Sequence, residues 1–235
     1  QPAADPRAGL YRHHPRQGAP RSLRRSRLAG TGGTEKDRAL FRISGEVVRL
    51  NMKYIFSKEW KLIEKAMADE CCLELPRLLK NTLVVGEDHR FWNHSGVDYF
   101  SLLRAIVKTG FFKNREGGST IAMQLVRVIT SNYQVTLKRK VIEILLAKKI
   151  TRIYGRERIL SKYLQLAYFG WNMHGIIDAS IKLKIDIGNM RLVDAADLIA
   201  RLKYPQSRFQ NPIQDAKIKR RSVHIVDNFL NNYGV

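Results

Sequence analysis

Two acidic residues, Glu87 and Asp88, stand side by side in the stretch GEDHRFWNHSG, which runs from Gly86 to Gly96. A carboxylate at such a position can act as a general base and take a proton from an attacking hydroxyl group. The two histidines of the stretch lack the spacing of a zinc motif, so they do not indicate a metal site. An adjacent pair of acids in a polar turn is also a common solvated surface feature, and the stretch alone does not decide between these interpretations.

A second acidic position, Glu143, follows Arg139 by four residues and Lys140 by three. In a helix this spacing places the three side chains on one face. The simple interpretation is a surface ion pair, which stabilises a helix only slightly. Because two cations favour its charged form, Glu143 is better suited to bracing cations or holding a metal than to donating a proton. Glu87 is freer to exchange its proton.

A third segment, REGGSTIAMQLVRVIT, joins two glycines to a predicted helix. Ser119 and Thr120 can cap this helix, and Gln124 and Arg127 are three residues apart on one of its faces. A helix start that follows glycines offers free backbone N–H groups to an anion. The segment lacks the Gly-Lys-Ser/Thr ending of a Walker loop, and on its own it predicts only a capped helix.

The elements that must position these residues belong to a basic chain of 235 residues with a net charge of +21. Residues 1–45 contain ten Lys and Arg against three acids, and residues 46–235 contain 32 against 18. We predict that residues 1–45 form a disordered basic tail and entry segment, and that residues 46–235 form one folded domain. Because the domain is basic by itself, we expect an anionic partner such as a nucleic acid, a phosphorylated substrate or an acidic membrane surface.

Apolar residues at helical spacing dominate the predicted domain and strand signals are sparse, so a mainly α fold is predicted. Trp60, Ile63 and Met67 mark one helix, and a second, apolar helix ends at the two adjacent acids. The expected elements are an extended entry segment over residues 39–56, helices within 58–70, 75–88, 97–114, 115–130, 137–170 (two, separated near Gly155) and 190–204, and a closing helix over about 215–231.

Membrane and redox features are few. Cys71 and Cys72 are neighbours, which rarely bridge, so no disulfide framework is expected. The chain has no run of about eighteen apolar residues, so no segment is predicted to span a bilayer by itself, and a membrane anchor is not visible. The strongly apolar segment after Gly96 contains Phe111 and Phe112, with Lys108 before them and Lys113 after them. It is either a core helix with an aromatic end or a surface whose two Phe side chains enter the membrane interface.

Four patterns occur in a fixed order along the chain. They are ED-x-x-F-x-x-H-x-G at Glu87–Gly96, GGST-I-x-x-Q at Gly117–Gln124, RK-x-x-E at Arg139–Glu143 and R-IL-x-x-YL at Arg158–Leu164. In this order they resemble the peptidoglycan glycosyltransferases, glycosyltransferase family 51, and in particular its single-domain, monofunctional transglycosylase type. The resemblance covers roughly Met52 to Phe229.

The resemblance implies a lysozyme-like, mainly helical domain that joins lipid II units into β-1,4-linked glycan strands and releases undecaprenyl pyrophosphate. Glu87 would be the general base that deprotonates the 4-hydroxyl of the acceptor sugar, with inversion at the anomeric carbon, and Glu143 would be the second acidic position. The remaining matched positions would contact or shape the substrate site: Asp88, Phe91, His94, Ser119, Thr120, Gln124, Arg127, Arg139 and Lys140.

The resemblance also implies partners and a location. The partners would be lipid II, the nascent glycan strand, a membrane surface at the outer face of the bacterial cytoplasmic membrane, and cell-wall proteins such as transpeptidases; no nucleic acid is expected. The chain contains no S-x-x-K sequence, so we expect cross-linking to come from another protein. Mg²⁺ or another divalent cation can bridge a pyrophosphate, although no set of protein ligands for it is visible, and no organic cofactor is expected.

Four positions depart from the family pattern. The usual Lys-Asn after the glutamine of the second pattern is Arg127-Val128 here, a usual acid eight residues after Glu143 is Thr151, and the Asn of the usual YLN is Gln165. These changes bear on efficiency and on the form of substrate accepted more than on the type of reaction, because none of them alters Glu87 or Glu143.

Three other functions compete with this prediction. A basic nucleic-acid-binding module fits the charge, but no recognised DNA- or RNA-binding signature is present. A lysozyme-like hydrolase would share the fold but would not need the cations that suit a pyrophosphate. A degenerate relative that binds glycan or lipid without turnover would explain the departures. Polymer formation from labelled lipid II separates these alternatives.

Overall fold

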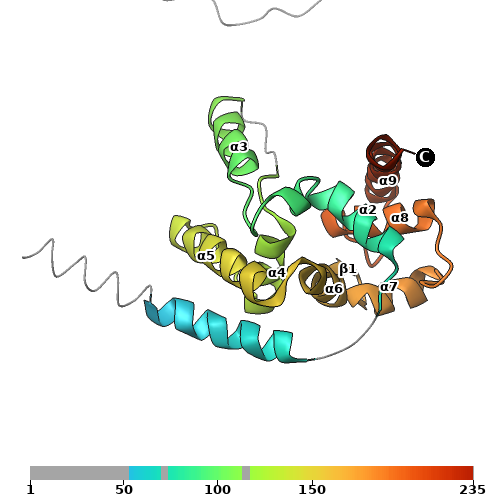
Figure 1. The fold of residues 1–235 in the computed structure, drawn as a ribbon. Coiled ribbons are helices and arrows are strands. Elements are labelled where there is room, and N and C mark those ends of the chain that lie inside the picture. Colours follow the sequence, from blue (N-terminus) through green and yellow to red (C-terminus); the bar gives the residue numbers. More distant parts are fainter. Residues whose placement is uncertain (1–52, 70–73, 113–116, 235) are drawn as a thin grey trace, which may run out of the picture. The chain divides into compact units, whose positions relative to one another are not determined.

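The computed structural model describes residues 53–69, 74–112 and 117–234, and this part of the chain is built almost wholly from helices (Figure 1). All of it belongs to one compact unit, and the predicted tail over residues 1–45 lies outside the described residues. The mainly α prediction is confirmed. In chain order the helices are one over residues 53–68, then α2 (Arg77–Glu87), the short 3-10 helix η1 (Phe91–Asn93), α3 (Tyr99–Phe112), α4 (Ile121–Thr130), α5 (Leu137–Tyr154), α6 (Arg156–Leu166), α7 (Gly175–Leu183), α8 (Leu192–Lys203) and α9 (Pro212–Tyr233).

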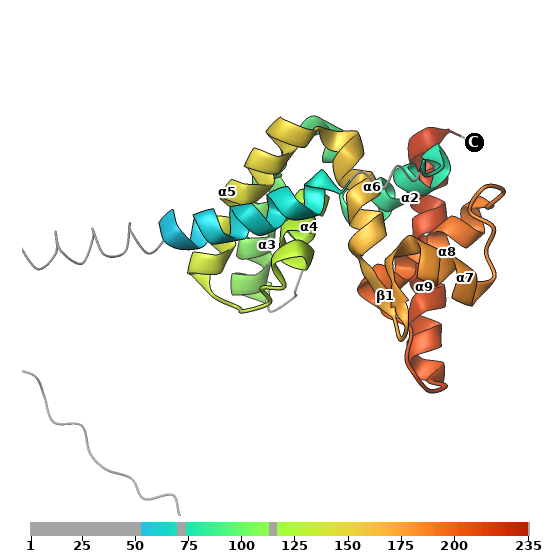
Figure 2. The ribbon, with the colours of Figure 1, turned by 90° about the horizontal axis from the view of Figure 1, so that it is seen from below.

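Helix α6 lies between two groups of helices, as the two perpendicular ribbon views show (Figures 1 and 2). On one side α4 packs against both α5 and α6. On the other side α2, α8 and α9 pack on one another, and α7 packs against α6. Because α6 contacts both α2 and α4, it holds the end of α2 that carries the adjacent acids at a set place relative to the first turns of α4.

The helix over residues 53–68 is anchored by the residues that marked it in the sequence. Ile63 and Met67 are fully buried in the core, and Trp60 packs partly against it. The Lys149 ammonium lies over the Trp60 ring, 3.5 Å from its centroid. Arg158 donates a hydrogen bond of 2.6 Å to the Met67 carbonyl oxygen, which ties the end of this helix to α6.

The loop after α2 is held against α4 and α5 through Gly96. This residue has φ +95°, and a Cβ atom there would lie 2.5 Å from both the Ala147 carbonyl oxygen and the Thr151 hydroxyl of α5. Its own carbonyl oxygen accepts a hydrogen bond of 2.7 Å from the Thr120 hydroxyl at the start of α4. Glycine is therefore required here both by backbone conformation and by the close approach of α5.

Most expected elements differ from the structure only at their edges, but helix α7 was not expected. Residues 53–56, expected to be extended, begin the first helix, and the rest of the entry segment lies outside the described residues. The closing helix α9 begins at Pro212, three residues earlier than expected, because Asn211 caps it and proline suits the first helical position. Two short antiparallel strands after α6, β1 (Tyr168–Gly170) and β2 (Met173–His174), were not expected. The separation of α5 from α6 at Gly155 is confirmed.

The described helices include none that is both long enough and apolar enough to cross a bilayer. The largest apolar side chains instead form one core shared by both helix groups, with Phe91, Leu83, Leu125 and Phe169 among those fully or almost fully buried.

Replacing Gly96 by alanine is expected to lower the free energy of unfolding by about 1–3 kcal/mol, because the new Cβ would be strained at this φ and would collide with α5. Gly117→Ala is the matched control, since a Cβ there would meet no atom within 4 Å. Urea unfolding followed by circular dichroism measures both. Equal stability of the two variants would contradict the role given to Gly96.

Candidate active site

Glu87 is the last residue of α2 and faces a cavity of about 490 Å³. The apolar face of α2, with Leu79, Leu83 and Val84, is buried in the core and fixes the direction of the helix. The prediction that the acids lie at the end of an apolar helix is confirmed. The other residues that line the cavity are Gly86, Gly117, Ser119, Gln124, Arg127, Lys203 and Arg221.

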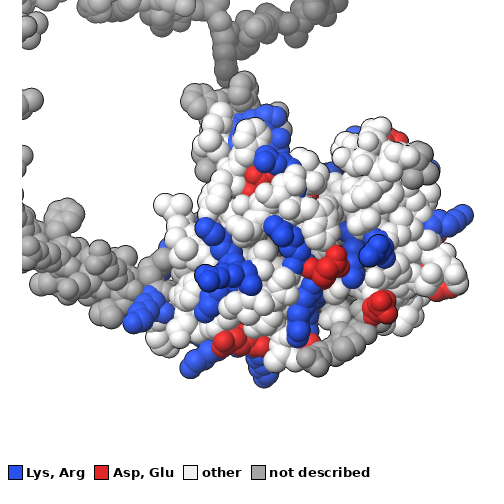
Figure 3. Space-filling model, viewed as in Figure 1, with Lys and Arg blue, Asp and Glu red and all other residues white. Residues whose placement is uncertain are grey.

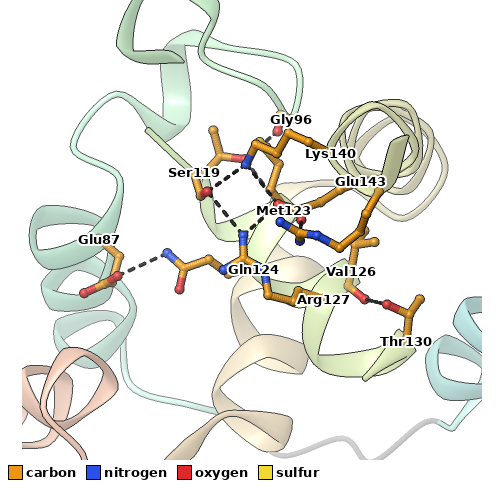
Figure 4. Close-up of polar contacts among 12 residues, drawn as sticks. Glu87, Gly96, Ser119, Met123, Gln124, Val126, Arg127, Thr130, Lys140 and Glu143 are labelled. Carbon is orange, nitrogen blue, oxygen red and sulfur yellow. Dashed lines mark hydrogen bonds and ion pairs between the residues drawn. The ribbon is translucent and has the colours of Figure 1, made fainter. Parts of the chain in front are cut away.

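The two carboxylate oxygens of Glu87 have different surroundings. Oε2 accepts a hydrogen bond of 3.1 Å from the Gln124 side-chain amide, which Figure 4 shows reaching across from α4. Oε1 is buried and, among the described residues, has no hydrogen-bond partner; its nearest cation is Arg221, at 3.7 Å. Burial raises the pKa of the Glu87 carboxyl, while the Gln124 hydrogen bond and the charges of Arg221 and Lys203 oppose that shift. A largely buried carboxylate with one free oxygen suits a general base.

Tyr163 sets the direction of the Gln124 amide. Its hydroxyl donates a hydrogen bond of 2.6 Å to Oε1 of Gln124, so the amide nitrogen of Gln124 is turned toward Glu87. Burial raises the pKa of the Tyr163 hydroxyl, which keeps it a donor at neutral pH. Tyr163 lies within the fourth sequence pattern, but its contact with Gln124 was not predicted.

Asp88 faces away from the cavity and joins the loop to α4. Its Oδ2 accepts a hydrogen bond of 3.1 Å from the backbone N–H of Ile121, in the first turn of α4. Nε2 of His94 lies 3.0 Å from Oδ1, and the backbone N–H of Gly96 donates to Nδ1 of the same ring. The proton of the neutral His94 ring is therefore on Nε2 and points to Asp88. Asp88 acts on the site by fixing the end of α2 to the start of α4.

Phe91, His94 and Thr120 shape the structure around the site and do not line its cavity. Phe91 is almost completely buried and meets the His94 ring edge-on. Thr120 is the N-cap of α4: its hydroxyl accepts a hydrogen bond from the Met123 N–H and donates to Gly96. The capped helix predicted from Ser119 and Thr120 is confirmed, with Thr120 as the cap. Phe111 and Phe112 are the last two residues of α3, but their side chains lie outside the described ones.

The Glu143 carboxylate lies in a cluster of three cations, two from its own helix and one from α4 (Figure 4). It is 3% exposed, which excludes the surface ion pair weighed from the sequence. Oε1 accepts hydrogen bonds from Arg127 at 2.8 Å and from Lys140 at 3.2 Å, and Oε2 accepts one from Arg139. Burial lowers the pKa of the Lys140 ammonium, and the Glu143 carboxylate opposes this shift.

Ser119 connects the cation cluster to the cavity. Its hydroxyl accepts hydrogen bonds from Lys140 at 2.9 Å and from Arg127 at 3.3 Å. Arg127 and Ser119 line the cavity themselves, whereas Arg139 and Lys140 are not among its lining residues and approach it through Glu143 and Ser119. Glu87 and the cluster around Glu143 therefore act on one cavity from two sides.

The four departures from the family pattern are accommodated locally. Arg127 supplies a forked cation that contacts both Ser119 and Glu143. Val128 lines an adjoining cavity of about 570 Å³. Thr151 donates a hydrogen bond to the Ala147 carbonyl beneath Gly96, and the backbone carbonyl of Gln165 lies against Gly175.

Two cavity residues, Lys203 at the end of α8 and Arg221 in α9, were missed in the sequence. They are separated from Glu87 by more than a hundred positions and carry no spacing signal toward it. Only packing of α8 and α9 against α2 brings them to the site.

Within the described residues, no three His, Cys, Asp or Glu side chains gather as metal ligands. Both Glu143 oxygens are occupied by cations, so this carboxylate does not fit a metal ligand, and Glu87 is the only carboxylate among the cavity-lining residues. A divalent cation that bridges a pyrophosphate stays a prediction.

Replacing Glu143 by glutamine is expected to lower the free energy of unfolding by about 3–5 kcal/mol, because three cations would be left without their buried counter-charge. Glu157→Gln is the control, since Glu157 pairs with Lys80 at the surface and should change stability little. Urea titration of both variants tests this. A Glu143→Gln protein as stable as Glu157→Gln would show that the cluster does not hold α4 to α5.

Comparison with known proteins relates this site to one family. The family model described as Transglycosylase matches residues 64–229. The chain is 34% identical over 157 residues to penicillin-binding protein 1A/1B of Bacillus subtilis (strain 168), an alignment that covers 64% of this chain and 17% of that protein. It is 28% identical over 186 residues to penicillin-binding protein 1A of Rickettsia bellii (strain RML369-C), covering 75% and 23%.

A third relative is penicillin-binding protein 2a of Streptococcus pneumoniae (strain ATCC BAA-255 / R6), 33% identical over 154 residues, which cover 64% of this chain and 20% of that protein. The chain spans about a fifth of the length of these curated relatives. The family model covers well over half of the chain and includes every residue of the cavity. The protein therefore belongs to the transglycosylases, the family of glycosyltransferases that act on peptidoglycan.

Proposed function

We propose that this transglycosylase domain polymerises lipid II into β-1,4-linked glycan strands and releases undecaprenyl pyrophosphate. The observation that carries the proposal is a single cavity with the largely buried Glu87 carboxylate on one side and, on the other, Arg127 and Ser119 in front of the Glu143 cluster. This arrangement provides a base for an attacking hydroxyl and cations for a departing diphosphate.

Glu87 is proposed to remove the proton of the acceptor 4-hydroxyl as its oxygen attacks the anomeric carbon of the growing chain. A sugar hydroxyl has a pKa far above neutrality and needs a positioned base. Burial raises the pKa of Glu87, which makes its ionised form a stronger base. Gln124 holds Oε2, and the buried Oε1 is left to accept the proton.

The diphosphate is proposed to leave toward Arg127 and Ser119, with Lys140 and Arg139 behind them. The leaving group gains negative charge as its bond to the sugar breaks, and an arginine fork can bind two phosphate oxygens at once. Three cations around one carboxylate leave the cluster with two net positive charges, which a departing diphosphate can balance. Attack from the Glu87 side and departure on the cation side would invert the anomeric configuration.

Hydrolysis by a lysozyme-like mechanism is less well supported by this site. An inverting or retaining hydrolase needs a second carboxylate that reaches the sugar or a water molecule. Glu143 is buried and accepts hydrogen bonds from three cations, so neither of its oxygens is available for that role. Gln124, Glu87 and the cation cluster are all in place, which supports turnover over the alternative of a binding protein without activity.

We also propose that α3 lies at the outer surface of the cytoplasmic membrane. Tyr99, Leu103 and Val107 are four residues apart, so they share one face of α3, and their side chains are 55%, 62% and 44% exposed. Large apolar side chains exposed together on one helix face are unusual. The Lys148 ammonium lies over the Tyr99 ring. Figure 3 shows Lys and Arg side chains gathered over α3 and α5 on this face. Apolar side chains beside cations suit the interface of an anionic bilayer. Phe111 and Phe112, at the end of the same helix, are proposed to add to this contact.

Replacing Glu87 by glutamine is expected to abolish polymer formation from labelled lipid II while the fold is retained, because the amide cannot take the hydroxyl proton. The control is Glu157→Gln, which removes a carboxylate from the surface of α6. Product is measured by gel separation of glycan strands. Undiminished polymer from Glu87→Gln would refute the assignment of the base, and absence of polymer from the wild-type protein would refute the proposed function.

The Phe111→Ser, Phe112→Ser double variant and the Leu103→Ser, Val107→Ser double variant are each expected to weaken binding to vesicles that contain anionic lipid, measured by co-sedimentation. Val193→Ser with Ile213→Ser is the control, because these exposed apolar side chains lie on α8 and α9. Vesicle binding that is the same in all three variants would exclude α3 as the membrane contact.

A further inference from the structure

We propose that Arg221, in the closing helix α9, is a positioning residue that holds the Glu87 carboxylate in its ionised, reactive state. The inference rests on the proposed function, in which Glu87 is the base, and adds a residue that lies outside the four sequence patterns. Arg221 lines the same cavity as Glu87 although 134 positions separate them in the sequence.

The Arg221 guanidinium makes two contacts at the end of α2. Its Nη2 donates a hydrogen bond to the Gly86 carbonyl oxygen and lies 3.7 Å from Oε1 of Glu87. The two side chains are only 19% and 14% exposed, so little water screens their charges. The Nε of Arg221 is buried and, among the described residues, has no hydrogen-bond partner, so the orientation of the guanidinium is set by its contacts at Gly86 and Glu87.

Gly86 allows α9 to come this close. A Cβ atom at Gly86 would lie 2.8 Å from Cγ2 of Ile199 in α8 and 3.3 Å from Cδ1 of Ile225 in α9. A larger residue would therefore need the Ile199 side chain to shift and would crowd Ile225. Ile225 lies one turn after Arg221, so the contact that requires glycine also sets the reach of Arg221.

Glu87 is thereby held from two directions. Gln124 of α4 binds Oε2, and Arg221 of α9 faces Oε1. At 3.7 Å Arg221 acts on Oε1 through its charge and leaves the oxygen free to accept a hydrogen bond from a substrate hydroxyl. Among the described residues, the other charged or titratable groups that face Glu87 are Lys203 of α8, Arg127 of α4 and Tyr163 of α6, which lies behind Gln124. The neighbouring Asp88 faces away, toward Ile121 and His94.

Two opposing influences act on the pKa of the Glu87 carboxyl. Burial raises this pKa, and the charge of Arg221 lowers it. Without that charge the pKa would rise further, and the ionised base would be present only at higher pH. The acidic limb of the profile of kcat/KM against pH would move upward, whereas a residue that only supported the fold would reduce activity equally at every pH.

The experiment compares four proteins: wild type, Arg221→Gln, Arg221→Lys and Arg220→Gln. Glutamine keeps a donor for the Gly86 carbonyl but loses the charge, and lysine keeps the charge. Arg220 is the matched control because it is the exposed neighbour of Arg221 on α9. Polymerisation of lipid II is measured across pH, and the Glu87 carboxyl is titrated by ¹³C NMR, with Glu87→Gln identifying its signal.

We expect Arg221→Gln to move both the acidic limb and the NMR titration of Glu87 to higher pH by about one unit or more, the size of effect an opposite charge has at this distance. At a pH on that limb, kcat/KM should fall about tenfold, with kcat changing more than KM. Arg221→Lys should stay close to wild type, and Arg220→Gln should overlay it.

An Arg221→Gln protein whose titration and acidic limb overlay those of wild type would overturn the proposal. Failure of both Arg221 variants to fold, judged by circular dichroism, would assign Arg221 a structural role and overturn it as well. If the wild-type protein makes no polymer, the proposed function fails, and the NMR titration still decides whether Arg221 controls Glu87.

Discussion

The buried carboxylate of Glu143 is the interaction on which the rest of the site depends. Arg127, Arg139 and Lys140 would repel one another if they were brought together without it, and their desolvation would be costly. With the carboxylate in the centre, α4 and α5 meet through charge-assisted hydrogen bonds. This contact also sets where Ser119 and Gln124 lie, because both belong to the start of α4 or the loop before it.

The two glutamates of the site therefore differ in role because they differ in surroundings. Glu143 has three cationic partners and no free oxygen, so it organises charge. Glu87 has one hydrogen-bond donor, one cation at longer range and one open oxygen, so it can exchange a proton. Two glutamates, one lining the cavity and one behind its cationic wall, can in this way take different roles.

Local sequence rules accounted for much of the fold and part of the site. The cap at Thr120, the break at Gly155 and the end of α2 at the acids depend on neighbours within a few residues, and their predictions are confirmed. Arg221, Lys203 and the tyrosine behind Gln124 could not be found in the same way, because their roles arise from packing of α6, α8 and α9 against α2 and α4. The surface-pair interpretation of Glu143 was wrong for the same reason: spacing gives the helical face, but only tertiary packing determines burial.

The central claim is that a base and a diphosphate site face each other across one cavity. A crystal structure of the Glu87→Gln protein with lipid II bound tests it most directly. We expect the diphosphate of one molecule to contact Arg127 and Ser119, and the free 4-hydroxyl of a second to lie within hydrogen-bonding distance of the side chain at position 87. A diphosphate bound on another face of the domain, or an acceptor hydroxyl directed away from position 87, would contradict the account.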